Sequence, residues 1–374
     1  MNIIKEWTSP YNSFNSLKGL LYVDWYKAIK EWKDGKRSAP LAPIEASLDP
    51  IHACNLKCRH CNAHRYLEDD KYYSKMTDEH LMNLVAFLGN WGVKGICFAG
   101  GGEPTLHPKL GDALSACKDS GMEASVLTNG TLLTPELIDT IVKTCRWVGV
   151  SIDSASSKTY KIGRKVDLFN TAIFNLAQLA TIAKLSDFRC DVAFKFLIFN
   201  YNQHEIYTAC KLAKSIGVKD FHARPADYSH QGMGSLEDKI GVYDVDLVKE
   251  QFEKCHDLED KNFHVYTVVH KFDTQLKPKK GFSQCYAAPC CIQLCANGGI
   301  YLCPDQRFQE FYKIGTHYPD VDGIVKAWGG KKHYNLVFKT GKDNCTTRCT
   351  FGPYNNQCEM LAINEEDPFC WRFV

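Results

Sequence analysis

The chain has 374 residues, of which 45% are hydrophobic and 24% charged, and its formal net charge is +2. This length exceeds one ordinary hydrophobic core, and the nearly balanced charge gives no electrostatic case for binding nucleic acid or an anionic membrane. No apolar run approaches the roughly 18 residues of a membrane span, and the first residues lack the features of a signal peptide. We therefore expect a cytoplasmic protein whose 18 cysteines serve metal or redox chemistry rather than disulfides.

Residues 1–43 are rich in aromatic side chains and contain a stretch with apolar residues at helical spacing. The stretch ends at the turn-forming Asp34-Gly35. This pattern predicts an N-terminal helical cap over residues 1–43 that packs on the rest of the protein. The apolar positions are Leu21, Trp25, Ala28, Ile29 and Trp32.

From residue 44 onward, short apolar runs alternate with helical stretches, a pattern typical of successive βα units. Thr77 and Thr134 are suited to cap the helices that follow them, and Pro135 fits a first helical position. We predict an α/β fold in which a parallel sheet curls into a partial (βα)6 TIM-like barrel over residues 44–280. The six predicted strands are residues 44–48, 95–99, 124–128, 147–152, 190–199 and 220–224.

Half of the cysteines lie beyond residue 280. A basic, turn-rich stretch at 277–281 precedes them. We therefore expect a separate Cys-rich α+β domain at residues 281–374.

The loop after the first predicted strand carries Cys54, Cys58 and Cys61 in a C-x3-C-x2-C pattern. Thiolates hold iron–sulfur clusters or zinc, and three of them on one loop can bind three corners of a [4Fe–4S] cluster. No fourth cysteine is near in the sequence, so one iron could stay open to another ligand. A zinc knuckle or simply buried cysteines are the alternatives.

The second predicted strand ends in Gly100-Gly101-Gly102-Glu103-Pro104. Glycines let a backbone approach a ligand closely, and the Glu103 carboxylate is suited to an ammonium group. An ordinary glycine-rich turn is the alternative for this segment alone.

Together, the cysteine loop and the Gly101–Pro104 motif resemble the radical S-adenosylmethionine (radical SAM) superfamily, over residues of about 44–225. The resemblance implies a [4Fe–4S] cluster on Cys54, Cys58 and Cys61 that cleaves S-adenosylmethionine (SAM) to a 5′-deoxyadenosyl radical. Other positions match residues that commonly bind SAM in that family, with histidine where Tyr or Phe often precedes the third cysteine. These expected SAM-binding residues are His60, Gly101, Gly102, Glu103, Asn129, Ser151 and Asp153.

The C-terminal cysteines resemble the SPASM and Twitch extensions of radical SAM enzymes, which carry auxiliary [4Fe–4S] clusters. Gly298 and a hairpin turn between Cys295 and Cys303 fit the opening of that pattern. A structural zinc site remains the alternative. The resemblance implies one auxiliary cluster on Cys285, Cys303, Cys345 and Cys349, with Cys290, Cys291, Cys358 and Cys370 as possible ligands of a second.

Enzymes with such domains include alcohol dehydrogenases, sugar or cyclitol epimerases, and peptide or protein maturases. We expect dehydrogenation or epimerisation of a small polar, sugar- or cyclitol-like substrate. Modification of a peptide or protein side chain and a non-catalytic zinc or iron–sulfur protein are the alternatives. The expected partner is a low-potential electron donor such as flavodoxin or ferredoxin. His222, Arg224 and Asp227 are the expected substrate contacts, and the sequence names no catalytic acid or base.

Overall fold

The computed structural model describes residues 16–59, 61, 63, 74–226, 243–269, 272, 280–345 and 349–360. These residues form one ten-stranded sheet in the order β10-β9-β8-β1-β2-β3-β4-β5-β6-β7. The strands are β1 Glu45–Asp49, β2 Gly95–Phe98, β3 Glu123–Thr128, β4 Cys145–Ser151, β5 Asp191–Ile198, β6 Asp220–Pro225, β7 His264–Thr267, β8 Cys291–Cys295, β9 Gly299–Tyr301 and β10 Lys313–Thr316.

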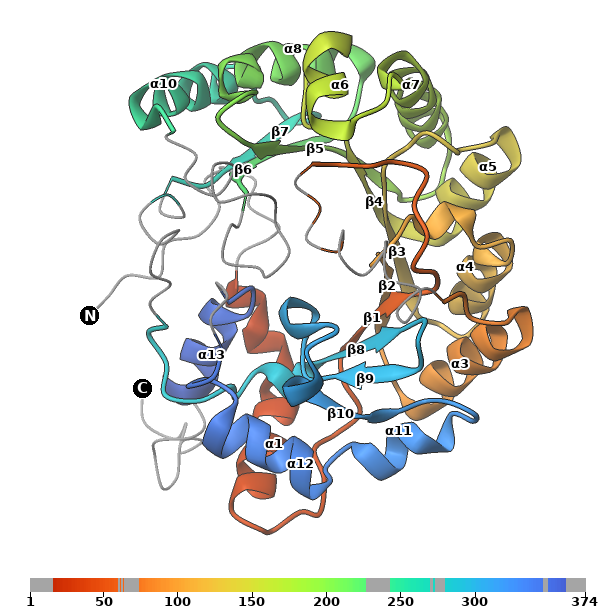
Figure 1. Cartoon of the computed structure of the whole chain (residues 1–374), viewed down its shortest axis with the longest axis vertical. Helices are drawn as coiled ribbons and strands as arrows, with labels where there is room; N and C mark the ends of the chain where they lie inside the picture. Colours follow the sequence, from red (N-terminus) through yellow and green to blue (C-terminus); the bar gives the residue numbers. More distant parts are fainter. Residues whose placement is uncertain are drawn as a thin grey trace.

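Strands β1 to β7 are parallel, and most of the helices that connect them lie outside the curve of the sheet (Figure 1). The helices are α1 Val23–Lys33, α3 Asp78–Trp91, α4 Leu110–Asp119, α5 Pro135–Thr144, α6 Ser157–Arg164, α7 Phe169–Leu185, α8 Ile206–Ile216, α10 Val245–His256, α11 Asp322–Ala327, α12 Lys331–Asn335 and α13 Gly352–Cys358.

The α/β partial barrel expected from the sequence is confirmed, and each of the six predicted strands is present within two residues. The sheet extends beyond those six strands. β7 pairs in parallel with β6, while β8 pairs in parallel with β1 and forms an antiparallel hairpin with β9. The sheet is therefore continuous across the predicted domain boundary at residue 280.

Local sequence accounts for several helix ends. The Thr77 hydroxyl accepts a hydrogen bond from the backbone N–H of His80 at 3.1 Å, and the Thr134 hydroxyl accepts one from Leu137 N–H at 3.2 Å. Gly92 ends α3 at φ 103°, in the left-handed region that glycine adopts without strain. The expected caps thus begin α3 and α5 where the sequence placed them.

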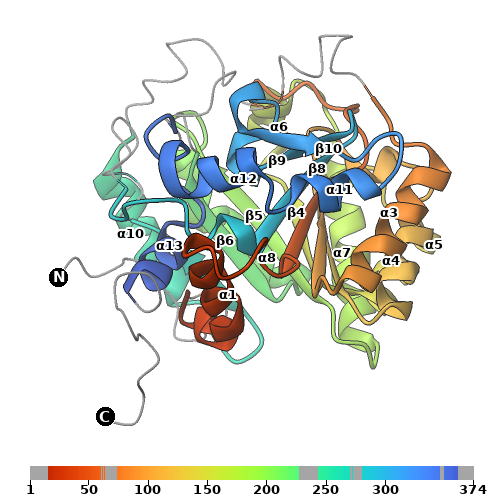
Figure 2. The same ribbon diagram turned by 90° about the horizontal axis from the view of Figure 1, so that it is seen from below.

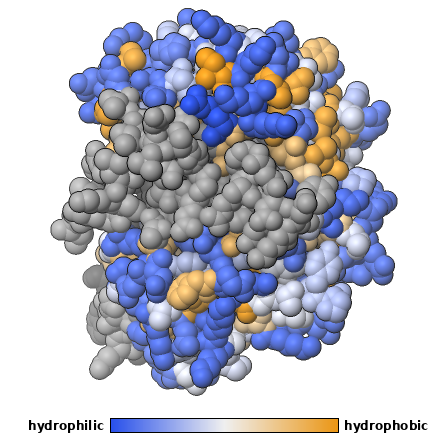
Figure 3. Space-filling model, viewed as in Figure 1, coloured by the Kyte–Doolittle hydropathy of each residue, from blue (hydrophilic) through white to orange (hydrophobic). Residues whose placement is uncertain are grey.

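The core lies between the outer face of the sheet and the helices. Alternate residues along the strands, such as Phe98, Val126 and Phe194, are fully buried there against Leu84 and Leu176. On the face seen in Figure 3, the described surface is mainly hydrophilic, and the apolar residues on it form small groups. Among the described residues no single helix could cross a membrane. Helices α6 and α7 meet that test only as a pair, with a bend of 105° between them.

Helix α1 lies beside the C-terminal helices, as Figure 2 shows. Its Trp32 ring packs 5.0 Å from the rings of both His333 and Phe338, and Tyr334 donates a hydrogen bond to the Lys33 carbonyl at 3.1 Å. The expected N-terminal helix is therefore present, and its described contacts include the C-terminal segment.

His333 is buried between aromatic rings, and burial lowers its pKa to about 3. A histidine in the unfolded chain has a pKa near 6.5. Below that pH, His333 therefore binds a proton in the unfolded state but stays neutral in the folded state. We expect the free energy of unfolding to fall as the pH decreases from about 6.5 toward 4. Denaturant unfolding at several pH values would show this slope, and His333→Leu should reduce it. The same change at the exposed His204 should leave it unaltered; equal slopes in both variants would contradict the assignment.

Candidate functional site

The three cysteines of the first loop lie together after β1. Cys61 N–H donates to the Cys58 carbonyl at 3.1 Å, and Cys54 Sγ accepts from Leu56 N–H at 3.4 Å. Burial, with a smaller contribution from the neighbouring Cys58, raises the pKa of Cys54 to about 11 and that of Cys61 to about 12. Three thiolates this close repel one another unless a cation lies among them. The donor set therefore fits a cationic iron–sulfur cluster. His60 lies outside the described residues.

Arg164, at the end of α6, connects this loop to β4. Its Nη1 donates to Cys58 Sγ at 3.3 Å, and its Nη2 donates to Asp153 Oδ2 at 2.6 Å and to the Ser151 carbonyl at 2.7 Å. The guanidinium is buried, and its charge acts to lower the pKa of Cys54 and of Cys61. Arg164 was not predicted, because 106 positions separate it from Cys58 and no motif marks it.

The glycine-rich segment packs directly on the cysteine loop. A Cβ on Gly102 would lie 2.2 Å from the Ala53 carbonyl oxygen, which also accepts a hydrogen bond from Glu103 N–H at 2.7 Å. A Cβ on Gly101 would come within 3.0 Å of the His52 ring. Position 102 therefore requires glycine if the two loops are to touch, because a side chain there would meet backbone atoms, whereas position 101 faces side chains.

The Glu103 carboxylate is buried and joins two strand ends. It accepts two hydrogen bonds from Thr105, one from the backbone N–H at 3.2 Å and one from the hydroxyl at 2.7 Å. From the end of β3 it accepts one from the Thr128 hydroxyl at 2.6 Å and one from Asn129 N–H at 2.8 Å. Desolvation raises the pKa of Glu103, and these donors act in the opposite direction. Glu103 thus holds the end of β3 against the glycine-rich segment.

The remaining expected SAM-binding residues lie at the same edge of the sheet. Asn129 Nδ2 donates to Asn55 Oδ1 on the cysteine loop at 2.9 Å. Ser151 is half-buried at the end of β4. Asp153 has φ 59° and accepts a hydrogen bond from Leu197 N–H at 2.7 Å. The structure brings these residues together around the cysteine loop, and their roles toward SAM stay predictions.

The C-terminal segment also reaches this edge. Arg307 Nη1 lies 3.2 Å from Asp49 Oδ2, and the Cys295 thiol donates to the same oxygen at 3.6 Å. The ligand atoms of Asp49, His52 and Cys295 lie within 4.8 Å of one another and could hold a metal ion by type. The ion pair with Arg307 already balances the charge of Asp49. We therefore interpret these side chains as a hydrogen-bonded network that joins β1 to β8.

The four cysteines expected to hold an auxiliary cluster are gathered in the C-terminal segment. Burial raises the pKa of Cys303 and of Cys349 well above the usual value, and in both cases Cys285 and Cys345 raise it further. Two side chains donate to the sulfurs, Gln306 to Cys345 at 3.1 Å and Asn355 to Cys349 at 3.6 Å. Four thiols in one place fit a four-iron cluster or zinc.

The possible ligands of a second auxiliary cluster are divided between two places. Cys290 and Cys358 pack with Tyr26 in an apolar cluster. Cys291, on β8, lies near Glu45 and Cys97 instead. Cys370 lies outside the described residues. Cys290 and Cys358 therefore lie close together as free thiols, whereas Cys291 interacts more strongly with Glu45 and Cys97 than with Cys290.

Of the expected substrate contacts, His222 and Arg224 lie on β6 and Asp227 lies outside the described residues. His222 is buried with its Nε2 3.9 Å from Asp220 Oδ2, and burial lowers the pKa of His222 to about 4. His264 Nδ1 lies 3.4 Å from the other oxygen of Asp220.

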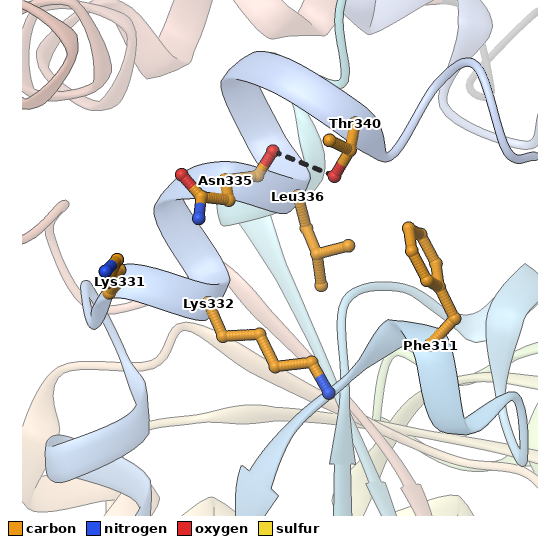
Figure 4. A pocket seen from close by; sticks show the side chains of 6 residues that line it. All are labelled: Phe311, Lys331, Lys332, Asn335, Leu336 and Thr340. Carbon is orange, nitrogen blue, oxygen red and sulfur yellow. Dashed lines mark hydrogen bonds between the residues drawn. The ribbon is translucent and has the colours of Figure 1, made fainter.

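The pocket in Figure 4 is separate and contains no thiol or carboxylate. It is lined by Phe311, Lys331, Lys332, Asn335, Leu336 and Thr340.

Comparison with known proteins identifies the class that this fold and site define. The family model described as "Radical SAM superfamily" matches residues 48–224. Residues 48–224 therefore form a radical SAM domain, and proteins of that superfamily bind a [4Fe–4S] cluster and SAM.

Each of two curated relatives matches about half of the chain. The subtilosin biosynthesis protein AlbA of Bacillus subtilis is 31% identical over 192 residues, which are 50% of this chain and 40% of AlbA. The AdoMet-dependent heme synthase of Methanosarcina barkeri is 30% identical over 214 residues, 56% of this chain and 58% of that protein. The chain thus spans about half the length of these curated relatives.

A solved structure matches more of the fold. SuiB of Streptococcus suis superposes with a TM-score of 0.63 at 16% identity and covers 87% of this chain and 73% of SuiB. This likeness extends the shared fold into the Cys-rich C-terminal segment.

Proposed function

We propose that the chain reductively cleaves SAM to methionine and a 5′-deoxyadenosyl radical, which abstracts hydrogen from a small polar substrate in the barrel. The gathering of Cys54, Cys58 and Cys61 against Arg164 and the glycine-rich segment carries this proposal. A [4Fe–4S] cluster on the three cysteines supplies the single electron for the cleavage. The expected external electron source is a low-potential protein such as flavodoxin or ferredoxin.

The chain's own residues give the site its order. Glu103 and Gly102 fix the segment proposed to bind the methionine group against the cysteine loop. Arg164 holds Asp153 and the end of β4, proposed to line the nucleoside, against Cys58.

Modification of a peptide or protein side chain is the second candidate. The likeness to AlbA, whose name describes bacteriocin biosynthesis, favours it. The likeness to the heme synthase favours a small molecule. After the hydrogen atom is abstracted, dehydrogenation of either kind of substrate requires the loss of one further electron and a proton. A cluster held by Cys285, Cys303, Cys345 and Cys349 would accept that electron.

The test is an assay of anaerobically prepared, iron-loaded protein with SAM and a reductant. We expect about eight irons per chain, as two four-iron clusters require, and formation of 5′-deoxyadenosine. Zinc in place of iron, or iron without SAM cleavage, would contradict the proposal. Stimulation of the cleavage by small polar molecules or by peptides then separates the two substrate classes.

A further inference from the structure

The outward side of α6 carries a stripe of lysines. Lys158, Lys161 and Lys165 follow one another at spacings of three and four residues, so they lie along one side of the helix and its C-terminal end. All three are exposed, and so is Ile162, which lies among them and is 37% exposed. The opposite side of the helix is buried through residues such as Tyr160.

Helix stability does not account for this stripe. The dipole of α6 favours cations at its C-terminal end, which suits Lys161 and Lys165, but it opposes Lys158 in the first turn. Cations at these spacings also repel one another. Within the part of the chain that the structure describes, none of the three lysines forms an ion pair with a carboxylate. The positive charge is therefore kept on this side of α6 at a cost to the helix.

Two carboxylates that border α6 have other partners. Glu205 accepts hydrogen bonds from the hydroxyls of Ser156 and Thr159 at 2.6 and 2.8 Å. Asp167 accepts one from the Ser157 hydroxyl at 2.7 Å. The stripe therefore concentrates positive charge at one place on a chain whose formal net charge is only +2.

The C-terminal end of α6 lies against the cysteine loop (Figure 1). Lys57 N–H donates to the Arg164 carbonyl at 3.3 Å, and Arg59 N–H donates to the Gly163 carbonyl at 2.9 Å. The Arg164 side chain donates to Cys58 Sγ at 3.3 Å. A single side chain thus connects the helix that carries the stripe to a proposed ligand of the cluster.

We propose that the face of α6 formed by Lys158, Lys161, Ile162 and Lys165 is the docking surface for an acidic electron-transfer protein that reduces the cluster of the cysteine loop. The reduced cofactor of this partner loses one electron, and the oxidised cluster gains it. Electron-transfer proteins associate through small interfaces, and complementary charge speeds their encounter. The lysines supply that charge, and Ile162 supplies an apolar contact among them.

The inference rests on the proposed function, because the cluster of this loop needs an external electron only if it cleaves SAM. It deepens that function by assigning the surface through which the electron enters and the charge of the partner that brings it.

The test measures the Kd of an oxidised flavodoxin of net negative charge for the iron-loaded protein, by anaerobic isothermal titration calorimetry without SAM or reductant. Replacing Lys158, Lys161 and Lys165 together by glutamine should raise the Kd about tenfold at low ionic strength, because three complementary charges are lost. Added sodium chloride should shrink this difference, since it screens the charges of the parent.

The matched control removes three exposed lysines that lie on other elements. Glutamine at Lys94, Lys211 and Lys261 changes the net charge equally and should leave the Kd within about twofold of the parent's value, because distant exposed charges are screened. An equal loss of affinity in this control would show that net charge, not the face of α6, attracts the partner, and would overturn the proposal.

A second readout is the rate at which reduced flavodoxin, below saturation, bleaches the visible absorbance of the cluster. This rate should fall about tenfold in the α6 variant and stay unchanged in the control. Excess dithionite should reduce all three proteins to the same extent, which shows that the clusters are intact. The proposal is wrong if the α6 variant binds flavodoxin as tightly as the parent, or if the parent does not bind it. A parent that binds flavodoxin but forms no 5′-deoxyadenosine would contradict the proposed function alone.

Discussion

Replacing Arg164 by leucine is expected to lower the free energy of unfolding by about 3–5 kcal/mol, because it leaves the Asp153 carboxylate buried without its counter-ion. The side chains of Arg164 and Asp153 are only 9% and 4% exposed. The substitution also removes the hydrogen bond to Cys58 Sγ. Denaturant unfolding of the variant and the parent, monitored by circular dichroism, would measure the difference.

The chain offers a matched control for this change. Arg146 and Asp191 are joined at the same 2.6 Å, but their side chains are 28% and 20% exposed. Arg146→Leu should therefore cost less than about 1 kcal/mol, because solvent screens a partly exposed ion pair. Combining Arg164→Leu with Asp153→Asn should recover part of the loss, since asparagine carries no charge and tolerates φ 59°. An equal cost at Arg164 and Arg146 would show that burial does not set the strength of this pair.

The elements with local signals were predictable from the sequence. The parallel strands stand out as apolar runs, and Thr77 and Thr134 mark helix starts by their short-range hydrogen bonds. The cysteine loop and the glycine-rich segment can be recognised from the spacing of their residues in the sequence. Their contact, in which Gly102 lies against Ala53, follows once β1 and β2 are neighbours.

The parts that were not predictable depend on contacts between distant segments. β8 pairs with β1 although the two strands are far apart in the chain, and no periodicity in the sequence predicts this pairing. The contact between Arg164 and Cys58 was also not predictable, because the two residues are far apart in the sequence.

Cys54, Cys58 and Cys61 are proposed to hold the cluster that cleaves SAM. Replacing all three by alanine should lower the iron content by about four atoms per chain and leave the iron of the C-terminal segment in place. Formation of 5′-deoxyadenosine should fall to the level of a protein-free control, because the cluster proposed on the C-terminal segment has four cysteine ligands and leaves no iron open to SAM. Alanine at Cys117, Cys190 and Cys210, three buried cysteines outside the site, is the matched control and should retain both properties.

The most direct measurement is the rate of 5′-deoxyadenosine formation from SAM and reductant in these two triple variants and the parent. We predict product from the parent and the control, and none above background from the variant without Cys54, Cys58 and Cys61. Product formed by that variant at the parent's rate would contradict the assignment of the cluster to this loop.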